Sequence, residues 1–233
     1  IFYEKMSNYR YEIKYSLDES MYSEVMVWLL TRTKVRKKYF PRQVNSLYFD
    51  DSNYSSIRDN IIGLSERLKY RLRWYKENDN SLLTSPKFEI KQRLGRLGKK
   101  KSIDIPTFVT KIESSSFKKI ESNLRIELIN SGHVFKEYLS PSLAVTYWRE
   151  YYEDDFGLRI TIDKEIKFFC VDALNSNLTK CPQSSHNRYI LEIKFDANLK
   201  NYASKLISSL NLTPTRHSKY LLGLAKFGEV IYV

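Results

Sequence analysis

Glycine, proline and cysteine are scarce in this sequence, and each shortage narrows the class of protein. Seven glycines and six prolines in 233 residues, with 42% hydrophobic residues, argue against low-complexity tracts and long disorder. Cys170 and Cys181 have no CxxC or histidine-rich surroundings. Two such cysteines define no disulfide framework, so a reducing, cytoplasmic setting is the simplest interpretation.

Long apolar runs and common catalytic motifs are also missing. The longest apolar candidate, residues 25–30, falls far below the roughly 18 residues that a membrane span requires. Nothing resembles a signal peptide, and no P-loop, GxGxxG or GxSxG motif is present. His133, His186 and His217 share no ligand spacing, which disfavours a histidine metal site.

Positive charge, in contrast, is abundant. The 39 basic and 27 acidic residues give a net charge of +12, which indicates an anionic partner such as nucleic acid, anionic lipid or a polyphosphate. Eighteen tyrosines among basic residues could serve single-stranded nucleic acid. Because strand periodicity explains most of these tyrosines, we expect no nucleic acid partner.

The hydrophobic pattern predicts one α+β domain. The domain is expected to cover residues 6–233, with a helical insertion at 106–132 and residues 1–5 set aside as a leader. Strands are expected at 9–15, 44–50, 66–76, 86–94, 98–105, 142–153, 157–163, 165–170 and 187–196, and helices at 18–31, 52–62, 117–131, 199–210 and 218–227. Short turns between most strands favour an antiparallel sheet.

Six of the predicted strands alternate charged and apolar residues. Residues i and i+2 of a strand face the same side. One face therefore collects Arg10, Glu12 and Lys14; Arg71 and Arg73; Glu89, Lys91 and Arg93; Tyr147 and Arg149; Arg159, Thr161 and Asp163; and Glu192 with Lys194. The opposite faces are apolar.

A closed barrel of about eight strands, with helices packed outside and charges inside, would satisfy both faces. An ordinary solvated sheet also alternates apolar and charged residues, and it is the better explanation of any one strand. The repetition over six strands and the richness in arginine favour a charged tunnel. Confined cations require an anion of high charge density, and arginine suits phosphate.

The glutamates on the charged face call for a separate reason, since a carboxylate repels phosphate. A divalent cation would bridge the two, because Mg²⁺ or Mn²⁺ takes one or two carboxylates together with water and phosphate oxygens. Glu192 is the first candidate ligand, followed by Glu12 and Glu89. Salt bridges to neighbouring bases are the alternative role for all three.

Eight short sequence motifs support a family resemblance. In chain order they are YEIKY at 11–15, SLYFD at 46–50, KYRLRWY at 69–75, FEIK at 88–91, YWR at 147–149, RITID at 159–163, LEIK at 191–194 and SKY at 218–220. Together they resemble the VTC domain, the polyphosphate-polymerase branch of the triphosphate tunnel metalloenzymes (the CYTH-like superfamily), in a stand-alone, prokaryotic-type form.

The resemblance implies a metal-dependent enzyme that transfers the terminal phosphoryl group of ATP, or another triphosphate, to phosphate or polyphosphate inside a tunnel. The residues it implies for holding the triphosphate are Arg71, Arg73, Lys91, Arg149 and Lys219, with Lys14 near the acceptor. Tyr147 and Ser218 would add hydrogen bonds, and Glu192 would hold the metal. Further substrate contacts are expected from Arg10, Arg159, Lys194, Lys99 and Lys101.

One departure bears on the reaction. Hydrolytic tunnel enzymes often carry ExExK on the first strand, whereas here Arg10 occupies the first glutamate position, which favours transfer over hydrolysis. A tripolyphosphatase or nucleoside triphosphatase and a non-catalytic polyanion-binding module remain the alternatives. The acceptor and any membrane partner are left open.

Overall fold

The computed structural model describes residues 9–76, 86–95, 97–105, 115–133, 138–171 and 177–230. The leader, residues 1–5, and part of the predicted insertion, residues 106–114, lie outside these ranges. The strands are β1 Arg10–Leu17, β2 Arg36–Asp50, β3 Glu66–Lys76, β4 Lys87–Leu94, β5 Leu97–Asp104, β6 Ser140–Glu153, β7 Arg159–Cys170, β8 Gln183–His186 and β9 Tyr189–Asp196. The α-helices are α1 Glu19–Arg32, α2 Ser55–Ile61, α3 Phe117–Asn130, α4 Lys200–Ser208 and α5 Lys219–Lys226, with short 3₁₀ turns at Leu178–Lys180 and Ala197–Leu199.

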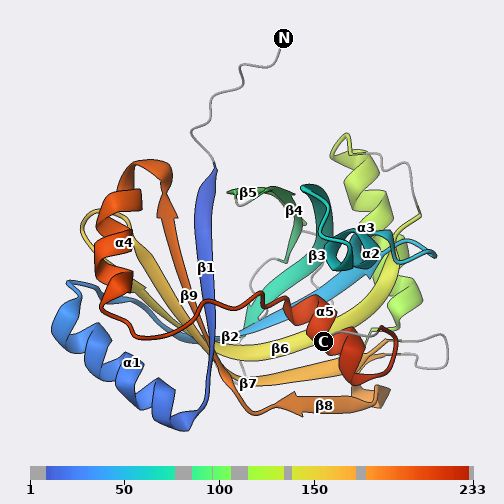
Figure 1. The fold of residues 1–233 in the computed structure, drawn as a ribbon. Helices are drawn as coiled ribbons and strands as arrows, with labels where there is room; N and C mark the ends of the chain where they lie inside the picture. Colours follow the sequence, from blue (N-terminus) through green and yellow to red (C-terminus); the bar gives the residue numbers. More distant parts are fainter. Residues whose placement is uncertain are drawn as a thin grey trace.

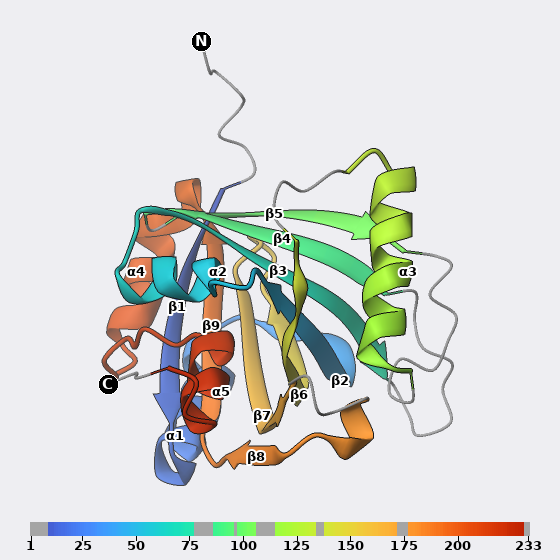
Figure 2. The same cartoon turned by 90° about the vertical axis from the view of Figure 1, so that its right-hand side faces the viewer.

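Eight of the strands form a closed antiparallel ring (Figures 1 and 2). They follow the order β6-β2-β3-β4-β5-β1-β9-β7, and β6 pairs with β7 to complete the circuit. The short strand β8 pairs with the C-terminal half of β7, past the residues of β7 that pair with β9. The ring confirms the predicted antiparallel tunnel. Its thinnest seam is between β1 and β5, where the described register covers Arg10↔Gly98 and Tyr11↔Leu97.

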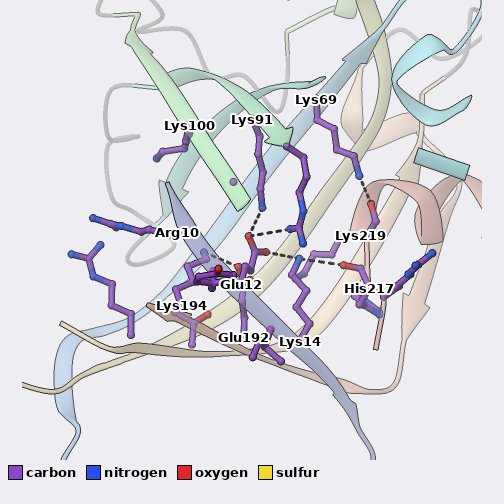
Figure 3. Close-up of a pocket in the computed structure, with 18 of the residues that line it drawn as sticks. Arg10, Glu12, Lys14, Lys69, Lys91, Lys100, Glu192, Lys194, His217 and Lys219 are labelled. Carbon is purple, nitrogen blue, oxygen red and sulfur yellow. Dashed lines mark hydrogen bonds and ion pairs between the residues drawn. The ribbon is translucent and has the colours of Figure 1, made fainter. Parts of the chain in front are cut away.

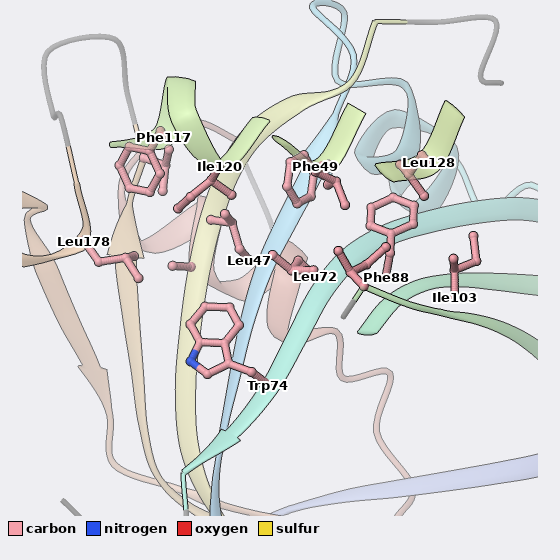
Figure 4. Packing of buried hydrophobic residues seen from close by; sticks show 14 residues of the cluster. Leu47, Phe49, Leu72, Trp74, Phe88, Ile103, Phe117, Ile120, Leu128 and Leu178 are labelled. Atoms are coloured by element: carbon pink, nitrogen blue, oxygen red, sulfur yellow. The ribbon is translucent and has the colours of Figure 1, made fainter. Parts of the chain in front are cut away.

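Helix α3 covers the outer face of the wall formed by β2, β3 and β4 (Figure 4). The side chains in this layer are buried and come from the apolar face of each strand and one stripe of the helix: Leu47, Phe49, Leu72, Trp74, Phe88, Ile103, Phe117, Ile120, Leu124 and Leu128. Burial of each large side chain is worth about 1.5–3 kcal/mol. This packing fixes which face of β3 and β4 turns inward.

Helices α1 and α4 cover the opposite wall. Val25, Trp28 and Leu29 of α1 and Ala203 of α4 pack with the outer faces of β1, β7 and β9. Helix α1 begins where the Asp18 carboxylate accepts a hydrogen bond from the Met21 amide, at 3.0 Å, a common N-cap arrangement. The expectation of helices on the outside of the tunnel therefore holds for α1, α3 and α4.

Helix α5 differs, because it packs against the inner face of the ring. Tyr220, Leu221 and Leu224 contact inward residues of β2 and β6, and the Tyr220 ring stacks on Tyr48 with centroids 4.7 Å apart. Helix α5 is thus an addition to the predicted arrangement of helices packed outside the tunnel. Apolar residues continue on the inner faces of β2 and β6 past the charged positions, and α5 covers them.

Three features of the strands differ clearly from the prediction, beyond shifts of one or two residues at strand ends. The two strands expected at 157–163 and 165–170 are one strand, β7, in which Glu165 has a positive φ of 53° beside an irregularity in the β6–β7 register, as at a β-bulge. β2 begins eight residues earlier than expected. The prediction missed residues 36–43 because they contain Pro41 and lack the alternation of apolar and polar residues that marks a strand. β8 was not predicted. No helix of the described residues has the length and apolar character needed to cross a membrane.

Candidate functional site

The inner face of the ring surrounds a cavity of about 2160 Å³ (Figure 3). The pleat of the strands turns nearly all the predicted site residues toward it. Those lining the cavity are Arg10, Glu12, Lys14, Arg71, Arg73, Lys91, Lys99, Tyr147, Arg149, Arg159, Glu192, Lys194, Ser218 and Lys219. The acidic members of the lining are Glu12, Glu153 and Glu192, so positive charge dominates.

Glu12 and Glu192 form an acidic pair within this basic lining. The antiparallel β1–β9 register places Lys14 opposite Glu192 and Lys194 opposite Glu12, so the two carboxylates are diagonal neighbours. Glu12 lies 2.9 Å from Lys14 Nζ and 2.7 Å from Lys91 Nζ, and Glu192 lies 2.7 Å from Lys194 Nζ. Burial would raise the pKa of Glu12, but these lysines hold the pKa well below its usual value. Burial and Glu12 raise the pKa of Glu192, but Lys194, Lys14 and Arg149 bring it below its usual value, so the surroundings favour the charged form of each carboxylate.

A second group is organised by Glu89. Its side chain is 1% exposed and accepts hydrogen bonds from Arg71 Nε at 2.8 Å, from Arg73 and from Lys100 Nζ at 2.7 Å. Burial opposes ionisation, yet these cations keep the pKa of Glu89 below its ordinary value. Three of its described contacts are with cations, and the Ser102 hydroxyl donates a fourth at 3.5 Å, an arrangement that matches the salt-bridge alternative for Glu89.

A third group surrounds Asp163, whose carboxylate is completely buried. Arg149 binds it through two nitrogens, with NH2 2.8 Å from Oδ2, and Lys219 donates to the same carboxylate. Arg149 also reaches Glu192 at 3.5 Å, and the Tyr147 ring lies 4.6 Å from Lys219 Nζ. Burial raises the pKa of the Tyr147 phenol, which leaves it a neutral hydrogen-bond donor.

The remaining predicted residues lie at the rim or outside. Arg10 is exposed and pairs with Asp196 at 2.9 Å, and Arg159 is exposed and pairs with Glu153 at 3.2 Å. Lys99 lies at the edge of the cavity. Lys101 does not line the cavity, and this prediction is corrected: Lys91 is opposite Lys100 in the β4–β5 register, so Lys101 is on the outward face.

Sequence reasoning missed several cations of the cavity lining, among them Lys69, Lys100 and Arg42. The spacing from Arg71 would have identified Lys69, which is two residues earlier on β3. The register between β4 and β5 was needed for Lys100. Arg42 lies in the unpredicted part of β2, where its guanidinium is 4.6 to 5.1 Å from the rings of Tyr39, Tyr75 and Tyr151.

The donor set of the acidic pair is suited to a hard divalent cation. No cluster of three or more histidine, cysteine, aspartate or glutamate residues in the described ranges is placed to hold a metal. Mg²⁺ and Mn²⁺, however, are commonly held by one or two carboxylates, with phosphates and water completing the shell. Glu12 Oε1 is buried and receives no aligned hydrogen bond, although Lys14 Nζ lies 2.9 Å from it, so a metal at this oxygen would compete with Lys14.

Comparisons with known proteins agree with this architecture. A family model described as the VTC domain matches residues 9–227. The PH1819 protein from Pyrococcus horikoshii has a similar structure, with a TM-score of 0.51 and 13% identity over 93% of this chain and 99% of that one.

Two further structures share the fold. A Hippeastrum protein, HpAC1, whose structure is reported to reveal a dominant triphosphatase activity, gives a TM-score of 0.52 and 13% identity over 95% of this chain and 97% of its own. A Vibrio parahaemolyticus protein with a provisional adenylate cyclase assignment gives 0.52 and 10% over 92% and 97%. No curated protein sequence is significantly similar to this chain.

Proposed function

The chain belongs to the VTC domain family and has a triphosphate-tunnel fold, and from this premise we propose that it is a metal-dependent polyphosphate polymerase. The enzyme would transfer the terminal phosphoryl group of ATP to phosphate or to a growing polyphosphate inside the cavity. The observation that carries the proposal is the grouping of inward arginines and lysines around the Glu12–Glu192 pair (Figure 3).

The three groups of charged residues suggest a division of labour. Arg71 and Arg73, held by Glu89, and Arg149 and Lys219, held by Asp163, would bind the triphosphate from two sides of the ring. Their side chains are already oriented by buried carboxylates, so binding costs little side-chain entropy. Lys91, Tyr147 and Ser218 would add contacts along the bound phosphate chain.

Lys14 is placed to serve the acceptor. Its ammonium lies between Glu12, at 2.9 Å, and the His217 carbonyl, at 3.2 Å. Burial would lower its pKa, but the two glutamates raise it above the ordinary value, so the charge is permanent. A permanent cation would hold an incoming phosphate against its repulsion by the triphosphate.

Glu12 and Glu192 would hold Mg²⁺ or Mn²⁺, which supplies charge neutralisation at the phosphate oxygens. The protein residues then need only align donor and acceptor and stabilise the charge of the transferring group, because phosphoryl transfer requires no nucleophilic side chain. Arg10, Arg159 and Lys194 would guide the polyanion at the rim.

Hydrolysis of a triphosphate is the second candidate. It is favoured by the shared fold of the Hippeastrum protein and its reported triphosphatase activity, and it would need water in place of the phosphate acceptor. Transfer is favoured by Arg10, which contributes no third carboxylate beside Glu12 and Glu192.

Incubation with ATP and Mn²⁺, followed by a polyphosphate gel, tests the proposal. Long chains support the polymerase. Release of orthophosphate alone would assign the hydrolase, and tight binding of tripolyphosphate with no product of either kind would assign a polyanion-binding module.

Replacement of the acidic pair tests the metal assignment. Glu192→Gln and Glu12→Gln are each expected to lower Mn²⁺-dependent turnover by 100-fold or more, on the order of 3 kcal/mol in the transition state, while polyphosphate binding changes less. Glu24→Gln, on the exposed side of α1, is the matched control. Equal turnover in all three variants would place the metal elsewhere.

A further inference from the structure

Eight cations of the cavity lining are held by four carboxylates. Glu89 holds Arg71, Arg73 and Lys100; Glu12 holds Lys14 and Lys91; Glu192 holds Lys194; and Asp163 holds Arg149 and Lys219. Lys69 lines the same cavity. Among the described residues its hydrogen-bond partner is a neutral group, the Ser218 hydroxyl, at 2.8 Å.

The surroundings of Lys69 disfavour its charged form. Lys91, Lys14 and Arg67 repel the Lys69 ammonium, and the attraction from Glu12 is smaller than any of these effects. Burial, and then these neighbours, lower the pKa of Lys69 well below its ordinary value. A hydroxyl offsets the charge of a buried ammonium less well than a carboxylate does, so an anion bound beside Lys69 would stabilise it.

The position of Lys69 separates it from the arginines that hold the triphosphate. Lys69 and Arg71 are on the same face of β3 and two residues apart, which corresponds to about 6.7 Å along the strand. Ser218, which Lys69 contacts, is the N-cap of α5 and also accepts from the Leu221 amide. Lys69 therefore faces the first turn of α5, on the side of Lys219 (Figure 3).

We propose that Lys69 and Ser218 form a distinct phosphate subsite, which binds a phosphate group of the chain beyond those held by Arg71 and Arg73. The inference rests on the proposed function. The subsite would add binding energy for tripolyphosphate and longer chains and little for pyrophosphate, which is too short to occupy both positions. Lys69 thereby selects for chain length.

Calorimetric titration of pyrophosphate and tripolyphosphate into the wild-type protein and Lys69→Met tests this selection. Loss of a charge-assisted hydrogen bond is expected to weaken tripolyphosphate binding by about 10- to 100-fold and pyrophosphate binding by less than about threefold. Lys69→Arg should restore most of the difference. The empty Lys69→Met protein should unfold at the wild-type temperature or above, because the variant removes a cation whose charged form is disfavoured by its surroundings.

Lys101→Met is the matched control, since it removes one lysine charge from the outward face of a nearby strand, and both affinities should stay within about twofold of wild type. Lys69→Gln, which can still hydrogen-bond Ser218, serves as a second variant if Lys69→Met does not fold. Wild-type affinity for tripolyphosphate in the folded variant, or an equal loss for both ligands, would overturn the subsite. These titrations require no turnover, so a protein that binds as expected but makes no polyphosphate would contradict the polymerase and leave the subsite standing.

Discussion

At the scale of single residues, the cavity is built from carboxylates that each hold several cations. Glu89 shows the arrangement most clearly, because one buried carboxylate contacts Arg71, Arg73 and Lys100. The three cations outnumber the carboxylate, so the group keeps a net positive charge, and the carboxylate fixes the orientation of the arginine guanidinium groups. The site is therefore preorganised for an anion before the anion arrives.

Glu89→Gln is expected to lower the stability of the protein without weakening its binding of tripolyphosphate. The variant leaves three cations without their carboxylate, which should lower the free energy of unfolding by about 3 kcal/mol. Tripolyphosphate should bind at least as tightly, since the freed arginines gain an anionic partner. Urea unfolding and calorimetric titration measure the two effects.

Glu66→Gln provides the comparison for this prediction, because Glu66 is exposed and bonded to Gln92. It should change stability by less than about 0.5 kcal/mol. Weaker tripolyphosphate binding in folded Glu89→Gln would show that the carboxylate is needed to aim the arginines.

At the scale of elements, helix α5 connects the apolar inner face to the charged site. Its first residues, Ser218 and Lys219, enter the cavity, while Tyr220 and Leu224 are buried against β2 and β6. Gly223 allows this close approach. A Cβ at this position would clash with Leu143 Cδ2 and lie 2.7 Å from Phe168 Cδ1.

Gly223→Ala is therefore expected to destabilise the protein, although alanine is the better helix former by about 1 kcal/mol. Overpacking costs about 1–3 kcal/mol, and the shift of α5 should weaken tripolyphosphate binding through Lys219. Thermal unfolding and titration check both. Adding Leu143→Ala to this variant removes the clashing methyl groups and should recover part of the binding. Wild-type stability and binding in Gly223→Ala alone would contradict the packing argument.

The segment that leads into α5 carries a pH-sensitive contact. His217 and His186 have ring centroids 5.5 Å apart, and both Nε2 atoms are buried without a hydrogen-bond partner among the described residues. Burial, and then Lys226, lowers the pKa of His186 to about 4. Burial, and then Lys219, lowers the pKa of His217 to about 3.

These shifts predict that stability falls as pH falls. In the unfolded chain both histidines titrate near an ordinary pKa of about 6.5, so between pH 6.5 and 4 the unfolded state binds more protons and is favoured. Urea unfolding at pH 7.5, 6 and 5 should show the decline. The slope should shrink in a His186→Gln, His217→Gln double variant and persist in His133→Gln, and a flat wild-type profile would contradict the prediction.

At the scale of the whole molecule, the ring has two walls and one thin seam. β6 pairs with β2 and β7 over most of its length, whereas the described β1–β5 pairing covers two residue pairs. Side-chain contacts cross the gap beyond the seam, as in the ion pair of Lys91 with Glu12. An anion bound by Lys14 on one wall and Arg71 on the other would tie the two together.

Amide hydrogen exchange should reveal this tie. Without ligand, β5 is expected to exchange faster than β6, and tripolyphosphate should slow exchange in β5 while leaving β6 unchanged. In Lys69→Met, which is expected to bind tripolyphosphate more weakly, the same ligand concentration should slow exchange in β5 less. Equal exchange in the two strands before ligand, or no change in β5 afterwards, would show that the seam is not the weak point.

Much of the site could be predicted from sequence because a strand has a period of two. Once Arg71 is assigned to the inner face, Arg73 and Tyr75 follow from the pleat, and so does Lys69. The same rule fails where the strand is irregular, as at Arg42, or where the face depends on a partner strand, as at Lys100 and Lys101. Sequence patterns carry local periodicity and no register between strands.

The sequence by itself determined the antiparallel α+β fold, the alternation that turns charge to one side, and the surplus of positive charge that demands an anion. These properties are local or additive, so they can be read along one chain. The tertiary structure alone decided that α5 enters the ring, that Glu89 faces three cations while Glu12 lies diagonal to Glu192, and that Lys69 pairs with a hydroxyl within the part of the chain that the structure describes. Each of these depends on which distant segments meet when the ring closes, and closure is a property of the whole fold.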